Sequence, residues 1–125
     1  MPTSAEVIAL LERYCAAMTN HQREEWLDCF ADDAVQEDPV GAPVNVGREA
    51  IGRFFDANIT DITLSVAAPP IVVGNEVLAF FRVDMMMGDT KMELPRIVDH
   101  IVLDETGTRF KSLRAFFDYS ELREV

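Results

Sequence analysis

Asp99, Asp38 and Tyr14 are the residues of this chain whose types and surroundings are suited to acid–base chemistry. Asp99 interrupts an otherwise apolar segment, residues 96–103, whose β-branched side chains predict a strand. The side chains of a strand alternate between its two faces. We therefore expect Asp99 to share its face with three aliphatic residues, Ile97, Ile101 and Leu103.

A carboxyl group surrounded by hydrocarbon is costly to ionise, so it either pairs with a cation or keeps its proton. The periodicity places no cation beside Asp99 on its own face, although Arg82 and Arg96 remain candidates for pairing. A carboxylic acid that keeps its proton is a hydrogen-bond donor, and such donors stabilise a developing oxyanion. Asp99 is accordingly a candidate oxyanion-hole residue, and an ion-paired Asp99 is the alternative.

Tyr14 and Asp38 are candidates for the remaining roles. Tyr14 falls on the apolar face of a predicted helix, where its hydroxyl either donates to a ligand or is satisfied within the core. Asp38 ends a short extended segment, residues 34–38, before Pro39, so it is either a turn aspartate or a carboxylate near water. Two carboxyl groups in such different surroundings have different pKa values, which lets one act as an acid and the other as a base.

The elements expected to position these residues are helices followed by strands. Thr3 and Glu6 have capping-box spacing at the start of the first helix. Helices are predicted over residues 4–18, from about residue 20 through Phe30, and after Gly47. Strands are predicted over residues 62–66, 71–73, 77–87, 91–103 and 109–119. This order predicts one α+β domain, residues 1–125, in which a curved antiparallel or mixed sheet forms a cone around three N-terminal helices.

Composition excludes several classes of function. A net charge of −11 over 125 residues argues against binding to nucleic acid or to an anionic membrane surface. Neither a membrane-spanning run nor a signal peptide is evident, so we expect a cytoplasmic protein. The two cysteines and two histidines do not have ligand spacing, and the chain carries no glycine-rich phosphate loop. We therefore expect neither a metal nor a phosphate-containing cofactor.

Several short segments together resemble the bacterial steroid Δ5-3-ketosteroid isomerases, whose fold is shared with nuclear transport factor 2, scytalone dehydratase and SnoaL-like proteins. The resemblance covers nearly the whole chain. The matching segments are Arg-Tyr at 13–14, Phe-Ala-Asp-Asp-Ala at 30–34, Glu-Asp-Pro-Val-Gly at 37–41, Gly-Arg-Glu-Ala-Ile at 47–51, Val-Asp-His at 98–100 and Leu-Arg-Ala-Phe-Phe at 113–117. Tyr14, Asp38 and Asp99, in this order and with these neighbours, are the specific part of the match.

The resemblance assigns a role to each of these three residues. Asp38 matches the family's general base, which takes a proton from the carbon between the ketone and the double bond and returns it two carbons along. Tyr14 and Asp99 match the oxyanion hole, with Asp99 protonated; the family is itself the known example of a carboxylic acid kept neutral to donate a hydrogen bond. Because the proton returns to the substrate, the resemblance implies no cofactor.

The resemblance also implies a small apolar steroid substrate and a homodimer formed through the outer sheet face. Apolar side chains expected to contact the substrate are Phe81, Met85, Phe116, Phe117, Phe55 and Val40. Leu78, Phe80, Val98 and Val102 are compatible with an apolar outer face. Phe30 and Phe55 stand where some relatives have tyrosines that hydrogen-bond the catalytic tyrosine, and Phe117 stands where some have tryptophan.

Two other classes of function remain open at this point. One is a different acid–base enzyme of the same fold, such as a polyketide cyclase, a dehydratase or an epoxide hydrolase, although the Asp-Arg-Asp group of the last is not evident. The other is a non-catalytic pocket or adaptor protein like the transport factor. Three polar groups within apolar surroundings favour an enzyme over a simple binding protein.

Overall fold

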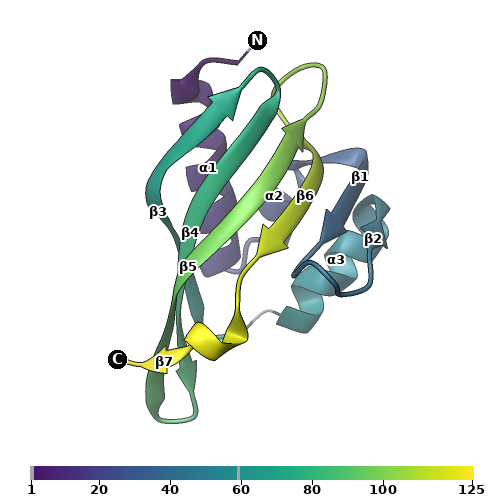
Figure 1. Cartoon of the computed structure of the whole chain (residues 1–125). Helices are drawn as coiled ribbons and strands as arrows, with labels where there is room; N and C mark the ends of the chain where they lie inside the picture. The colour runs from purple at the N-terminus through teal and green to yellow at the C-terminus, as the bar shows by residue number, and fades with distance from the viewer. Residues whose placement is uncertain (1, 59) are drawn as a thin grey trace.

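Within residues 2–58 and 60–125, the part of the chain that the computed structural model describes, three α-helices lie against one face of a curved seven-stranded sheet (Figure 1). The helices are α1 (Ser4–Thr19), α2 (Arg23–Leu27) and α3 (Gly47–Asn58). The strands are β1 (Phe30–Glu37), β2 (Asn45–Val46), β3 (Ile62–Val73), β4 (Glu76–Met87), β5 (Thr90–Leu103), β6 (Phe110–Phe116) and β7 (Arg123–Glu124), and a short 3-10 turn, η1 (Tyr119–Glu121), precedes β7. The predicted α+β architecture is confirmed.

Helix α1 begins where the sequence predicts. Thr3 is its N-cap, and the reciprocal hydrogen bonds between Thr3 and Glu6 form a capping box. The residues that α1 buries are Val7, Leu10, Leu11, Tyr14, Cys15, Ala17 and Met18. This stripe has the three–four spacing of an amphipathic helix, and it turns Tyr14 toward the sheet.

The sheet has the order β2-β1-β6-β5-β4-β3, and β7 pairs with the N-terminal part of β5. Strands β1 and β6 are parallel, whereas the other pairs are antiparallel. Three predicted boundaries differ from the structure. The strand predicted to reach residue 119 ends at Phe116. Phe30 begins β1 instead of ending a helix, and residues 62–66 and 71–73 belong to the one strand β3, whose register shifts between Val66 and Ile71. The chain stays extended there because Pro69 and Pro70 favour extended backbone without ending the pairing to β4.

Strand β5 carries a register shift that sets the orientation of its side chains. Its pairing with β4 shifts between Leu94 and Ile97, next to Pro95. Both Leu94 and Ile97 are therefore buried although three positions separate them. Beyond the shift, alternation is regular, and Asp99 lies on the buried face as predicted. That face also carries Ile97, Ile101 and Leu103.

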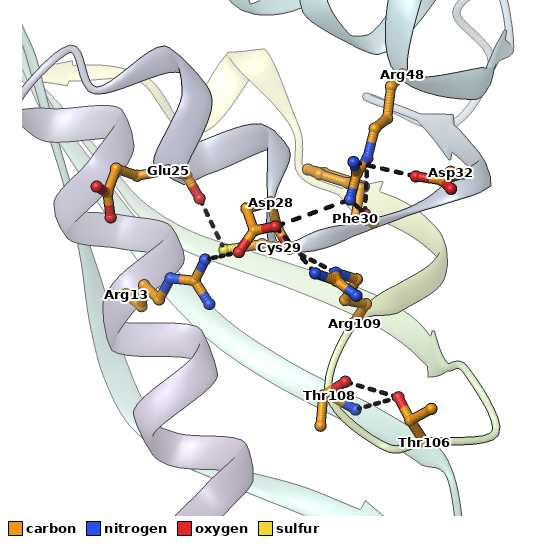
Figure 2. A network of polar contacts seen from close by, with 10 residues as sticks. All are labelled: Arg13, Glu25, Asp28, Cys29, Phe30, Asp32, Arg48, Thr106, Thr108 and Arg109. Atoms are coloured by element: carbon orange, nitrogen blue, oxygen red, sulfur yellow. Dashed lines mark hydrogen bonds and ion pairs between the residues drawn. The ribbon is translucent and has the colours of Figure 1, made fainter.

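A polar network ties α1, α3 and β6 to the junction between α2 and β1 (Figure 2). Asp28 accepts hydrogen bonds from Arg13 of α1 and from Arg109, the residue before β6 (3.0 Å). Arg48 of α3 donates to the Phe30 carbonyl at 2.6 Å. The network thereby fixes the start of β1, the strand that leads to Asp38. None of the described helices is both long and apolar enough to cross a membrane.

Candidate active site

A cavity of about 310 Å³ lies between the helices and the inner face of the sheet. Its walls are largely apolar, as a pocket for a small hydrophobic molecule requires. Tyr14, Asp38 and Asp99 all line this cavity, so the fold brings together three residues that are far apart in sequence. Apolar side chains on the wall include Met18, Phe54, Leu64, Phe81, Val83, Met85, Leu94, Ile97 and Phe117.

Asp99 occupies the middle of β5, where its direct cross-strand partners are Ala79 of β4 and Ala115 of β6. Cross-strand partners share a face, so the carboxyl group is flanked by two methyl groups. Asp99 is only 3% exposed, and its Oδ1 atom has no hydrogen-bond partner among the described residues. Burial, and then the neighbouring Asp38, raise the pKa of Asp99 well above its ordinary value. The raised pKa favours the protonated form of Asp99, and in that form the carboxyl group can donate a hydrogen bond.

The two arginines considered as partners of Asp99 form ion pairs elsewhere. Arg82 bonds to Asp84 (2.8 Å) and Glu93 (2.6 Å), and Arg96 bonds to Glu121 (2.6 Å). These ion pairs occupy the outer face and the end of the sheet, because neighbouring residues of a strand point to opposite sides. The ion-paired alternative for Asp99 is therefore contradicted.

Asp38 follows β1, at the start of a turn that is held against β6. The Val40 N–H donates to the Ala115 carbonyl at 2.8 Å, which places this turn beside the residue opposite Asp99. Asp38 is partly buried, and this burial raises its pKa to about 6. The carboxylate is therefore mostly ionised at neutral pH, yet it is a stronger base than an ordinary aspartate. Its neighbour Glu37 points away and pairs with Arg114.

Tyr14 is held in the cavity wall by aromatic rings. Its centroid lies 5.7 Å from that of Trp26 and 5.9 Å from that of Phe81, and Phe30 and Phe110 pack edge-on against it. Burial raises the pKa of Tyr14 well above its usual value, with Asp99 and Asp38 adding to the effect. The phenol thus stays protonated and is a second donor facing the cavity.

The structure divides the predicted substrate contacts into two groups. Phe81, Met85 and Phe117 line the cavity. Phe55 is fully buried behind the wall, Phe116 is 43% exposed on the opposite face of β6, and Val40 is 36% exposed on the turn. The last three are not among the residues that line the cavity.

The wall also contains residues that the sequence analysis did not select. Phe54 lines the cavity in place of Phe55, because one helical position rotates a side chain by about 100°. Met18 lies at the end of the apolar face of α1, so the helical periodicity of the sequence could have identified it as a residue facing the sheet. Tyr119 belongs to η1, the turn that follows β6, whereas the sequence pattern predicted it as the last residue of that strand.

The arrangement combines an ionised carboxylate with two protonated donors in one apolar cavity. Such a site can remove a proton from carbon and stabilise the negative charge that forms on a nearby oxygen. Within residues 2–58 and 60–125, no cluster of three or more His, Cys, Asp or Glu side chains could hold a metal ion.

Comparisons with known proteins agree with this fold, and one of the relatives that they find is named for an activity. The sequence profile of the SnoaL-like domain matches residues 11–111. A protein of Nocardioides simplex named Steroid Delta-isomerase is 34% identical over 115 residues, which are 91% of this chain and 91% of that protein. The crystal structure of RV0760c from Mycobacterium tuberculosis superposes with a TM-score of 0.83 at 22% identity, over the full length of both chains. This last similarity supports the fold alone.

Proposed function

The chain belongs to the SnoaL-like domain family, and we propose that it is a steroid Δ5-isomerase, which converts β,γ-unsaturated 3-ketosteroids into their α,β-conjugated isomers. One observation carries the proposal: a half-buried carboxylate and two protonated donors line the same apolar cavity. The direction of each pKa shift favours the protonation state that the proposed step of that group requires.

In the proposed mechanism, the Asp38 carboxylate removes a proton from the carbon between the ketone and the double bond. The electron pair moves into the carbonyl group and forms a dienolate, whose oxygen accepts hydrogen bonds from Tyr14 and Asp99. Asp38 then returns the proton to the far end of the original double bond, two carbons along. The proton leaves and re-enters the same molecule, so the reaction is balanced without any further reactant.

Two further observations support a steroid as the substrate. The relative that is 34% identical is named Steroid Delta-isomerase. The cavity volume, about 310 Å³, lies near the lower end of the ~300–1,000 Å³ typical of small-molecule sites, and its polar residues are few. A rigid, mostly apolar molecule with one ketone to place between Tyr14 and Asp99 suits this environment.

The direct test uses purified protein and 5-androstene-3,17-dione. We expect the ultraviolet absorbance of a conjugated enone to grow at a rate far above that of buffer. The control is the Asp38→Asn variant, which should be slower by several orders of magnitude while retaining its circular-dichroism spectrum. A wild-type rate equal to that of buffer would end the steroid proposal, and near-normal turnover by Asp38→Asn would remove Asp38 from the role of base.

We further propose that the protein is a homodimer joined through the outer face of its sheet. Phe80, Val98 and Phe116 are register partners across β4, β5 and β6, so their side chains form one apolar row on that face. Leu78 and Ile71, which are also partners, extend the apolar surface toward β3 and are 38% and 51% exposed. A contiguous exposed apolar patch of this kind marks an interaction surface.

A further inference from the structure

Trp26, the only tryptophan of the chain, is fully buried behind the cavity wall, and the proposed mechanism gives it no role. Its indole stacks on the Tyr14 ring, with centroids 5.7 Å apart and planes 29° apart. It also stacks on Phe54, at 6.3 Å and 18°. Tyr14 and Phe54 both line the cavity, whereas Trp26 is not among the lining residues. One side chain behind the wall thus contacts both a proposed donor and an apolar wall residue.

Hydrogen bonding does not explain why a tryptophan occupies this position. The indole Nε1 atom of Trp26 has no acceptor among the described residues. A buried donor without an acceptor is destabilising, so the indole N–H group lowers the stability of the folded protein. The indole is wider than a single ring, so its two fused rings contact both Tyr14 and Phe54. They also pack against Phe30 and Phe55, with ring centroids 4.8 Å and 5.1 Å away.

The orientation of Tyr14 depends on such contacts. The rings around it belong to Trp26, Phe30, Phe81 and Phe110, and among these the indole alone stacks on it at less than 30°. Phe30 and Phe55 have no hydroxyl group with which to hold the phenol by a hydrogen bond. The direction of the Tyr14 O–H therefore follows from the shape of the aromatic cage, and catalytic donors lose effect when misplaced by fractions of an ångström.

We propose that Trp26 is a positioning residue, whose indole fixes the ring plane of Tyr14 from behind the wall and so aims the phenol at the substrate oxygen. Its consequence for turnover rests on the proposed function. The placement of the Tyr14 ring does not, and it can be measured without substrate.

Magnetic resonance provides the measurement that is independent of activity. The chain has two tyrosines, Tyr14 and Tyr119, so labelling tyrosine Cζ with carbon-13 gives two signals, which Tyr119→Phe assigns. Trp26→Phe keeps an aromatic ring but cannot contact both Tyr14 and Phe54, and Trp26→Leu removes the stack altogether. We expect both variants to shift or broaden the Tyr14 signal and to leave the Tyr119 signal unchanged.

Ile51→Ala is the matched control, because Ile51 is fully buried and is not among the cavity-lining residues. It should lower thermal stability without moving the Tyr14 signal. An unmoved Tyr14 signal in both Trp26 variants, or an equal shift in Ile51→Ala, would overturn the proposal. If Trp26→Leu fails to fold, Trp26→Phe decides the result alone.

Kinetics then test whether Trp26 acts through Tyr14. We expect Trp26→Phe to lower kcat about tenfold with little change in KM, the effect of a misaimed donor. In a Tyr14→Phe background the same substitution should lower kcat by less than about twofold, because the group it positions is already gone. Equal losses in both backgrounds would contradict positioning. A wild-type protein without isomerase activity would remove the proposed function, while the Tyr14 signal would still decide the role of Trp26.

Discussion

Asp99 and Ala115 are direct partners across the antiparallel pair β5–β6, and the Ala115 carbonyl accepts the N–H of Val40, in the turn that carries Asp38. Ala115 therefore stands between the strand of the buried acid and the turn of the base. Its side chain is a single methyl group that lines the cavity. A small residue at this point keeps open the space in which a substrate would lie between the two carboxyl groups.

Enlarging Ala115 should close that space. We expect Ala115→Leu to lower kcat/KM about 100-fold, chiefly through KM, because the added atoms occupy substrate volume in a rigid wall. Steady-state kinetics with the steroid ketone measure this effect. Ala115→Gly is the control, since it leaves the space open and should retain most activity. An unchanged KM in a folded Ala115→Leu variant would show that substrate does not occupy this part of the cavity.

Replacing Asp99 should slow catalysis without lowering the stability of the protein. Asp99→Leu removes the donor and should lower kcat by about 10²–10³-fold, the usual loss for one oxyanion-hole donor. The same variant should be as stable as the wild type or more so, because it removes a buried oxygen that has no hydrogen-bond partner in the part of the chain that the structure describes. Asp99→Asn retains a neutral donor and should lose less than Asp99→Leu. Turnover and urea unfolding of the two variants test this, and an active Asp99→Leu would exclude Asp99 from the oxyanion hole.

Sequence periodicity was sufficient to predict the fold class and to place Asp99 on an apolar face, because alternation in a strand and the three–four spacing of a helix follow from backbone geometry alone. Tyr14 was likewise predicted on a buried helical face. Asp38 was a candidate from its position before Pro39, but the resemblance to ketosteroid isomerases was needed to assign it the role of base, because its segment also looks like an ordinary turn.

What the sequence could not supply was the position of single side chains relative to the cavity. Phe54 and Phe55 both fit the apolar face of α3 and both pack against Trp26, and only the structure shows that Phe55 is fully buried while Phe54 lines the cavity. Phe116 and Phe117 are consecutive, so alternation lets only one of them face the cavity, and the structure shows that Phe117 lines it while Phe116 is exposed. The register shift beside Pro95 depends on pairing with a strand that is distant in sequence.

The pH dependence of turnover should follow the ionisation of Asp38. Burial raises the pKa of this carboxyl to about 6, and only its ionised form accepts a proton from carbon. We therefore expect kcat/KM to rise with pH up to about 6 and to level off near pH 7. A profile that is already flat at pH 5 would mean that the base has an ordinary aspartate pKa.

The same carboxyl should destabilise the folded protein at neutral pH. Its pKa is raised on folding, so the folded state binds the proton more tightly, and stability falls as the pH rises from about 4 to about 6. Asp38→Asn should raise the free energy of unfolding at pH 7.5 by roughly 1–3 kcal/mol, the upper value applying without solvent screening. At pH 4 the two proteins should be almost equally stable. Equal stability at both pH values would contradict the raised pKa.

The outer face of the sheet should control the oligomeric state. A charge in the apolar row of Phe80, Val98 and Phe116 would have to be desolvated in a dimer, so Val98→Asp should give monomers in sedimentation equilibrium where the wild type gives dimers. The control is Lys111→Glu, which changes an exposed charge on β6 away from that row. A monomeric wild-type protein at micromolar concentration would contradict the dimer proposal.

Asp28 should contribute stability that depends on pH and salt, without acting in catalysis. Arg13, and then Arg109, hold the pKa of Asp28 below its ordinary value of 3.8 (Figure 2). A lowered pKa means that the stabilisation is present above that ordinary value and is lost as the pH falls through the depressed one. Because Asp28 is 47% exposed, Asp28→Asn should cost only about 1 kcal/mol at pH 7 in low salt, and less in 1 M salt.

Urea unfolding at pH 7 and pH 2.5 measures this cost, and turnover per folded molecule should not change. Glu49→Gln is the matched control, since it removes an exposed acid whose ion pair with Arg53 lies within a single helix. The control should have a smaller effect than Asp28→Asn, because Asp28 joins elements that are distant in sequence. If Asp28→Asn destabilised the protein equally at both pH values, the loss would come from packing and not from charge.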